Sequence, residues 1–174
     1  MEANRIKKGQ YVVYGTNGVC HVDDVCEMAF PAGQEKKLYL LLRPLSDSAS
    51  VIYLPSENQA LIEKLRPTLT RRESEVLLAS ASERKMEWIE DRKLRTFTFR
   101  NMIQQSHPDL LLSLIRCVCV HRDELAAQNK KLASADREAM EAAFKAICEE
   151  LVFSLERPRE EIIEQIEKAL AVQL

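Results

Sequence analysis

The feature that most constrains the fold is a change in hydrophobic pattern between residues 55 and 70. Before it, β-branched and aromatic residues form short runs separated by turn residues, as in Tyr11–Tyr14. After it, apolar residues recur every three or four positions, which is the period of an α-helix. The chain therefore combines a strand-rich first part with a helical second part, which predicts an α+β protein.

The first part reads as a small curled sheet. Asn17-Gly18 lies between two apolar runs and predicts a hairpin with a type I′ turn, which needs positive φ at both central residues. Further strands are predicted at 38–43 and 51–54, each followed by proline, with a loop at 30–33. Several short strands with tight turns predict a small Tudor/SH3-like β-barrel domain over residues 1–65. Such a barrel usually leaves one edge strand available to a partner.

The second part, residues 66–174, reads as an all-α helical bundle. Ser56 with Gln59 resembles a capping box for a short helix, and Thr70 with Glu73 is a second one. Pro108 is expected in the first turn of a later helix. The expected buried stripes of the last three helices are Leu111, Leu114, Ile115 and Val118; Met140, Phe144, Ile147, Leu151 and Leu155; and Ile162, Ile163, Ile166 and Leu170. These stripes predict a bundle of about five helices.

The segment 84–100 carries Trp88, the single tryptophan of the chain. We predict a helix over this segment, with Met86, Ile89, Leu94 and Phe97 as its core stripe. Trp88 then faces solvent with the arginines Arg92, Arg95 and, if the helix begins early enough, Arg84. An exposed indole among cations suits a wedge into nucleic acid, because cations hold phosphates and the flat ring contacts bases. The alternative is that Trp88 closes a small core and the arginines pair with nearby acids.

Charge and composition exclude several classes of protein. Residues 66–132 carry a net charge of +4 and residues 133–174 a net charge of −5, which suits weak or local nucleic-acid contact as well as it suits solvated helix faces. No cysteine pair has zinc spacing, no glycine loop fits phosphate, and no nucleophile-base constellation occurs, so we expect no metal, no cofactor and no enzymatic activity. Without a signal peptide or membrane span, we expect a cytoplasmic protein. We also expect it to be a monomer.

Taken in order, these parts resemble the CarD/CdnL family of bacterial transcription regulators. The resemblance rests on the opening 8–19, on the strand and Pro-x-x-Asn segment 51–58, and on Trp88. It implies a Tudor-like first domain, shared with the transcription-repair coupling factor, that docks on the RNA polymerase β subunit. It also implies that the helical domain contacts promoter DNA at the upstream edge of the bubble, where the tryptophan wedges into the minor groove with little sequence specificity and stabilises the open complex.

By this resemblance, the polymerase contact is Val51, Ile52, Tyr53 and Leu54, and the DNA contact is Trp88, Arg84, Arg92, Lys93 and Arg95. The protein would then be nucleoid-associated through the polymerase. Two departures matter. Many members have a basic residue in place of Tyr53, and many have basic residues in place of Glu90 and Asp91. Intrinsic DNA affinity should therefore be weak, with polymerase supplying most of the anchoring. The competing hypothesis is a protein-protein adaptor that does not contact DNA.

Overall fold

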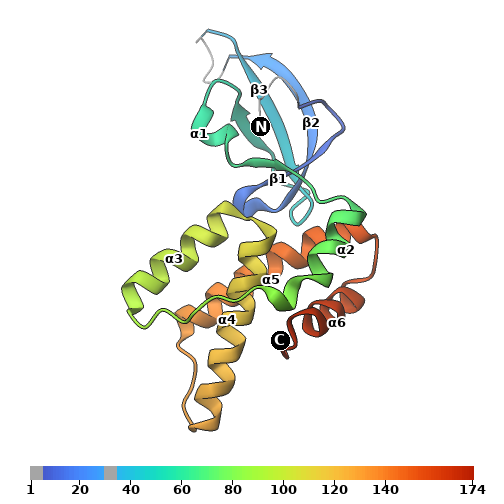
Figure 1. The fold of residues 1–174 in the computed structure, drawn as a ribbon. Coiled ribbons are helices and arrows are strands. Elements are labelled where there is room, and N and C mark those ends of the chain that lie inside the picture. Colours follow the sequence, from blue (N-terminus) through green and yellow to red (C-terminus); the bar gives the residue numbers. More distant parts are fainter. Residues whose placement is uncertain (1–5, 30–34) are drawn as a thin grey trace. The chain divides into compact units, whose positions relative to one another are not determined.

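The chain divides into two compact units, Met1–Thr68 and Leu69–Leu174. The computed structural model describes residues 6–29 and 35–174, so the loop predicted at 30–33 lies outside the described residues. The described strands all lie in the first unit and the second unit is helical, which confirms the predicted α+β class (Figure 1). The predicted domain limit after residue 65 falls inside the last strand of the first unit.

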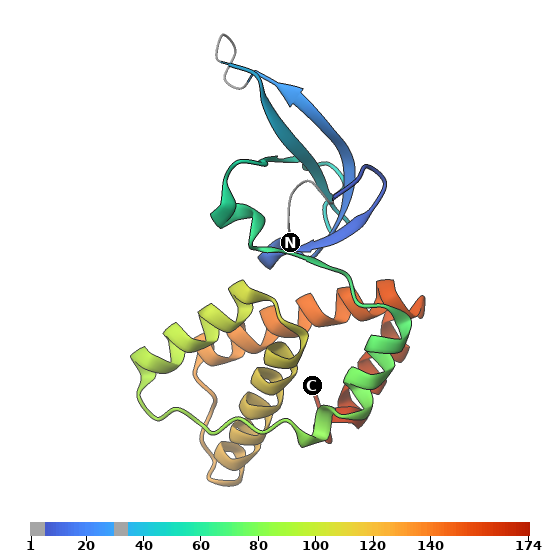
Figure 2. The same ribbon diagram turned by 45° about the horizontal axis from the view of Figure 1, so that its top comes forward.

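The first unit is a five-stranded antiparallel sheet in the order β4-β3-β2-β1-β5. Its strands are β1 (Tyr11–Tyr14), β2 (Val19–Met28), β3 (Lys37–Pro44), β4 (Ile52–Pro55) and β5 (Leu65–Pro67), with the short helix α1 (Gln59–Ile62) between β4 and β5. β2 and β3 form the long twisted pair visible in Figure 2. The core residues of this unit are Ile6, Val12, Tyr14, Cys20, Val22, Leu40, Leu42, Leu54, Ile62 and Leu65.

Two local predictions in this unit need correction. The hairpin of β1 and β2 is confirmed, but its connection contains the 3-10 helix η2 (Gly15–Asn17) and is not a two-residue type I′ turn. The positive φ angles fall on Gly15 (47°) and Gly18 (68°), which tolerate them because glycine has no Cβ. Helix α1 is capped by Asn58, whose side chain accepts a hydrogen bond from the Leu61 N–H, so the predicted cap at Ser56 is wrong.

The sequence pattern also missed β5. Leu65 pairs with Tyr14 and Pro67 with Val12, so β5 closes the sheet along the far side of β1. A three-residue strand that ends in proline has too few alternating residues to give a periodic signal. Its pairing with β1 is set by the tertiary fold.

The second unit, all of which is described, holds five α-helices and one 3-10 helix. They are α2 (Arg71–Ala79), η3 (Ala81–Glu83), α3 (Arg92–Gln105), α4 (Pro108–Ala127), α5 (Ser134–Leu155) and α6 (Arg159–Leu170). α5 is central, since it packs against α2, α3, α4 and α6 (Figures 1 and 2). Among the described residues, no helix combines the length and apolar character that crossing a bilayer requires.

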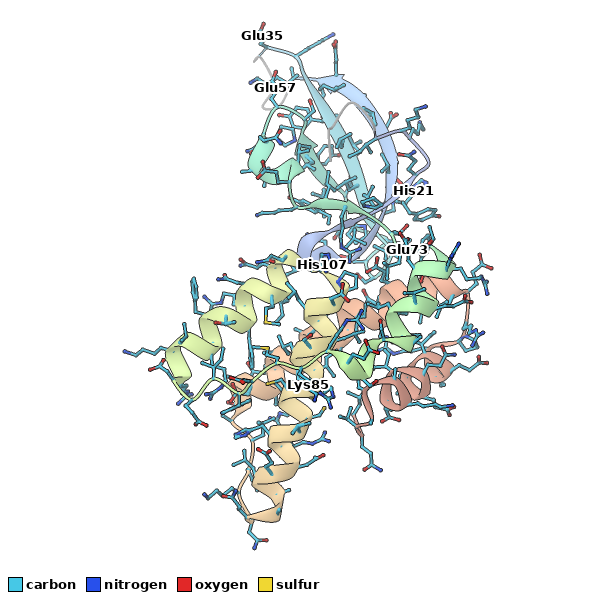
Figure 3. The ribbon with its side chains drawn as sticks, viewed as in Figure 1. His21, Glu35, Glu57, Glu73, Lys85 and His107 are labelled. Atoms are coloured by element: carbon cyan, nitrogen blue, oxygen red, sulfur yellow. The ribbon has the colours of Figure 1, made fainter. Side chains whose placement is uncertain are left out.

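Most of the predicted helix signals are confirmed. Thr70 and Glu73 form a complete capping box at the start of α2, where Glu73 is labelled in Figure 3. Pro108 begins α4, and the four residues of the predicted α4 stripe are all fully buried. The stripes of α5 and α6 also face the core, although Phe144 and Ile163 are only partly buried. These stripes form one continuous core in the second unit.

The helix predicted over 84–100 is wrong in its first half. The segment from Arg84 to Asp91 is irregular, and α3 begins at Arg92. Asp91 is the N-cap, and its carboxylate accepts a 2.7 Å hydrogen bond from the Leu94 N–H. The later start changes which residues face the core. The two predicted core residues Leu94 and Phe97 are 55% and 63% exposed.

The cysteines are core thiols. Cys20, Cys117, Cys119 and Cys148 are buried and Cys26 is half-buried. Burial raises the pKa of the Cys20 thiol to about 11, because a thiolate is poorly solvated there. At neutral pH this thiol is protonated and unreactive.

Candidate functional site

The strand expected to contact polymerase lies at one edge of the first unit's sheet. Among the described strands, β4 pairs only with β3, with Tyr53 opposite Leu41 and Leu54 opposite Leu40. Tyr53 is 48% exposed, whereas Leu54 is 1% exposed and packs in the core. Val51 and Ile52 are half-buried. Of the four predicted residues, Tyr53 therefore presents the most side-chain surface, and Leu54 can offer a partner only its backbone.

A hydrogen-bonded cluster lies on β2 and β3. The Asp23 carboxylate accepts hydrogen bonds from His21 Nδ1 at 2.7 Å and from Arg43 Nε at 2.6 Å. Arg43 also donates to the Ser48 carbonyl at 2.6 Å, which ties the loop after β3 to the sheet. The hydrogen bond to His21, followed by the Arg43 guanidinium, holds the pKa of Asp23 below its ordinary value. The cluster thus fixes one end of the sheet near His21 (Figure 3).

Trp88 is held on both faces of its ring. The His121 imidazole stacks on it with ring centroids 3.6 Å apart and planes 16° apart. The Arg95 guanidinium carbon lies 4.3 Å from the indole centroid, and Phe99 meets the ring edge-on at 6.3 Å. Because a ring stacked this closely on one face can take the cation only on the other, both faces are covered. Trp88 is half-buried and packs against the helical core, so its predicted position on the solvent face of a helix is wrong.

Arg95 organises the segment that carries Trp88. Its guanidinium makes two hydrogen bonds to the Asp136 carboxylate of α5, at 2.9 and 3.0 Å, and both side chains are buried. It also donates to the backbone carbonyls of Ile89, at 2.6 Å, and of Glu90. Bidentate pairing of this kind is strong and directional. Arg95 is therefore a structural residue of this unit, and its predicted position on the solvent face is wrong.

Arg84 is also engaged inside the second unit. It forms an ion pair with Asp109 at the start of α4, with Nε 2.5 Å from Oδ1. A second nitrogen of the guanidinium donates to the Leu77 carbonyl and to the Ser80 hydroxyl. Its side chain is only 19% exposed. These contacts fasten the start of the irregular segment to α2 and α4.

A pocket of about 410 Å³ opens beside Trp88, between this segment and α4. Lys85, labelled in Figure 3, and Arg116 line it together with Glu87 and Glu124. The Arg116 Nε is buried without a hydrogen-bond partner among the described residues. Because the walls carry charges of both signs, the pocket selects no particular ligand charge.

The remaining predicted DNA residues lie on the exposed side of α3. Arg92 and Lys93 are exposed, and so is Arg100, two turns further along the same side. Within the described part of the chain, none of the three takes part in an ion pair. Phe97 lies among them, and together with Thr96 these residues line an open hollow of about 480 Å³. The structure thus separates the predicted DNA set into an internal group and an exposed group.

Comparison with known protein families decides the nature of the first unit. Residues 6–66 match the family model of the CarD-like/TRCF RID domain, where RID denotes an RNA polymerase-interacting domain. The first unit is a CarD-like/TRCF RID domain. The match spans β1 to β5 but less than half of the chain, and it does not extend into the helical unit. No curated protein matches the chain significantly.

The β4 edge lies within the matched RID domain. The family match includes all four residues of the predicted polymerase contact, Val51–Leu54, of which the last three lie in β4. An RID domain indicates a polymerase-binding transcription regulator, although the same domain also occurs inside the transcription-repair coupling factor, which is an enzyme. The resemblance stated for this part of the sequence is confirmed.

Two residues of the exposed α3 face are absent from the predicted DNA contact. The helical pattern predicts Phe97 in the core, and it predicts no role for Arg100. A signal was present in the sequence, because no acidic residue occurs from Arg92 to Gln105 in a chain of which 30% is charged. A helix free of acids, capped by Asp91, is the pattern that marks this face.

Proposed function

We propose that this chain is a transcription regulator that docks on the RNA polymerase β subunit through its RID domain and contacts promoter DNA with its helical unit. The observation that carries the proposal is the RID family match at residues 6–66. The position of β4 at an edge of the sheet supports it, because an edge strand can pair its backbone with a strand of a partner.

In this proposal, the backbone of β4 supplies affinity and the exposed side chains supply specificity. Tyr53 is the principal anchor, since an aromatic ring with a hydroxyl combines apolar contact with a hydrogen bond. Leu54 supports the strand from inside the core, so only its backbone is available to the partner. A tyrosine in place of the basic residue found in many relatives makes the interface less dependent on salt.

The docking proposal is tested by capture of purified polymerase β subunit on the full-length chain. Tyr53→Glu should weaken the complex by about 1–3 kcal/mol, because it replaces an anchoring ring with a charge that must be desolvated. The matched control is Tyr11→Glu on β1, another exposed tyrosine, at 41%, three strands away from β4. Equal capture by both variants and the unchanged chain would exclude the β4 edge as the docking site.

For the DNA contact, we propose that the polymerase-bound chain stabilises the open promoter complex. Arg92 and Lys93 support it, because their exposed charges pair with no acidic side chain among the residues that the structure describes. Trp88 can wedge into DNA only if it exchanges its contacts with His121 and Arg95 for contacts with bases. If it does, Trp88→Ala should shorten the open-complex lifetime by about 5- to 150-fold, with polymerase capture unchanged.

One observation favours a second candidate function. The covered indole faces, together with the ion pairs of Arg84 and Arg95, are what a protein-protein adaptor with a rigid helical unit requires. The adaptor predicts that the chain binds polymerase without altering the lifetime of the open complex. Measuring that lifetime with and without the chain therefore separates the two functions.

A further inference from the structure

Helix α3 carries an unusual surface for a protein whose net charge is −2. Its fourteen residues include four basic side chains and no acidic one. One of the four, Arg95, is neutralised by Asp136 in the interior. The other three, Arg92, Lys93 and Arg100, leave the exposed side with an unbalanced positive charge.

The exposed residues of α3 form a ridge with helical spacing. Lys93, Phe97, Arg100 and Gln104 follow one another at intervals of four, three and four residues, which places them on one side of the helix. All four are exposed, whereas Arg95, Phe99 and Met102 on the opposite side are buried. We call these four ridge residues together with Arg92 and Thr96 the α3 face.

Phe97 is the feature of the α3 face that charge alone does not explain. Its ring is 63% exposed, while Phe99, two residues later, is 1% exposed. A phenylalanine this exposed contributes little to the core of its own unit. Its neighbours Lys93 and Arg100, one turn before and after it, can contact phosphates on either side of a base that lies on the ring.

We propose that the α3 face binds single-stranded DNA, with Phe97 stacking on one base and Arg92, Lys93 and Arg100 contacting the backbone. The three exposed positive charges favour a polyanionic ligand. The exposed aromatic ring favours a nucleic acid whose bases are unstacked, because only such bases can stack on it. A duplex would first have to unstack, whereas a melted strand offers such faces at once. This proposal depends on the function proposed above in one respect: the single strand would come from a promoter that polymerase has opened.

The other residues predicted to contact DNA are engaged in contacts inside the helical unit, which leaves the α3 face as the available cationic surface. Arg84 and Arg95 are committed to Asp109 and Asp136, and Trp88 is enclosed by His121 and Arg95. Binding through the α3 face requires none of these contacts to break. Single-strand binding should therefore persist when Trp88 is replaced, provided that the helical unit stays folded.

The test is fluorescence anisotropy of the full-length chain with a labelled oligothymidine strand of about 16 nucleotides, at low salt and without polymerase. Phe97→Ala should weaken binding by about 5- to 150-fold, the range for one stacked base. Phe97→Leu should bind as weakly as Phe97→Ala, because it keeps the apolar bulk and loses the flat ring, and Phe97→Trp should retain binding. Arg100→Gln should lower the salt dependence by about 0.7 in the slope of log K against log salt.

The matched controls are on α2, where Val76 is 60% exposed and Arg72 is exposed. Val76→Ala and Arg72→Gln should bind the strand like the unchanged chain. Thermal melts of every variant establish folding, and the exposure of Phe97 predicts unchanged melting temperatures. Failure of the unchanged chain to bind the strand, or equal binding by Phe97→Ala, would overturn the inference.

Capture of polymerase β subunit by the same variants keeps the two proposals distinguishable. We expect capture to be unchanged, because the contacts of the RID domain are on another unit. If the α3 variants lose polymerase while keeping the DNA strand, the α3 face binds protein and the inference is wrong. If the unchanged chain binds the strand but not the β subunit, the inference stands and the docking proposal fails.

Discussion

Replacing Trp88 with alanine should destabilise the helical unit by about 2–4 kcal/mol. A fully buried tryptophan costs about 3–5 kcal/mol on truncation to alanine, and Trp88 is half-buried. Within that loss, the His121 stack and the Phe99 edge contact contribute about 0.5–1.5 kcal/mol each, and the Arg95 contact about 0.5–2 kcal/mol. The pocket beside the ring lowers the cost, because water can enter the space that the indole leaves.

The assay is urea unfolding of the full-length chain followed by far-ultraviolet circular dichroism, which reports chiefly on the helical unit. The control is Phe97→Ala, also an aromatic truncation in this unit, which should change stability by less than about 0.5 kcal/mol because its ring is exposed. A loss below about 1 kcal/mol for Trp88→Ala would refute the reasoning. It would mean that the indole is loosely held in solution and available as a wedge.

Three further predictions concern other contacts. Arg95→Met alone should cost about 3–5 kcal/mol, since it leaves the Asp136 carboxylate buried without its partner, and the double variant with Asp136→Leu should recover most of the loss in a urea double-mutant cycle. The folded-state pKa of Asp23 lies below its ordinary 3.8. The ionised carboxylate therefore adds to the free energy of unfolding above pH 3.8, and this stabilisation is lost as the pH falls through the lower folded value. Asp23→Asn should remove this dependence and flatten the acid side of a curve of stability against pH. Removal of residues from Ser134 onward should abolish the cooperative melt of the helical unit, because α5 contacts every other α-helix of that unit, and a truncated chain with an unchanged melt would show α5 and α6 to be dispensable.

Much of the fold could be predicted because its signals are local. The capping box at Thr70, the proline at position 108 and the α4 stripe each depend on a few neighbouring residues, and the structure confirms all three. Strand β5 could not be found in this way, because its three residues are ordered by pairing with β1. The resemblance of the first part of the chain to the RID domain is confirmed as well, because it depends on several local motifs in a fixed order within residues 6–66.

The surroundings of Trp88 could not be predicted, because the prediction took residues 84–91 to be helical. With Met86 and Ile89 in a helix, the residues that face the core continue through Leu94 to Phe97. Once Asp91 is recognised as the N-cap, the stripe of α3 passes through Arg95 and Phe99. The burial of Arg95 depends on Asp136, forty-one residues away, and no periodicity contains that information.

The prolines at the ends of the RID strands have a consequence for self-association. Both edge strands are short and end in proline: β4 has four residues and ends at Pro55, and β5 has three and ends at Pro67. A proline has no backbone N–H to donate, so any ladder formed on these edges is limited to the few residues that precede it. Short edges that end in proline also discourage edge-to-edge aggregation. The β4 edge can thus offer a partner a short stretch of backbone, while its few residues give two copies of the chain little length over which to pair.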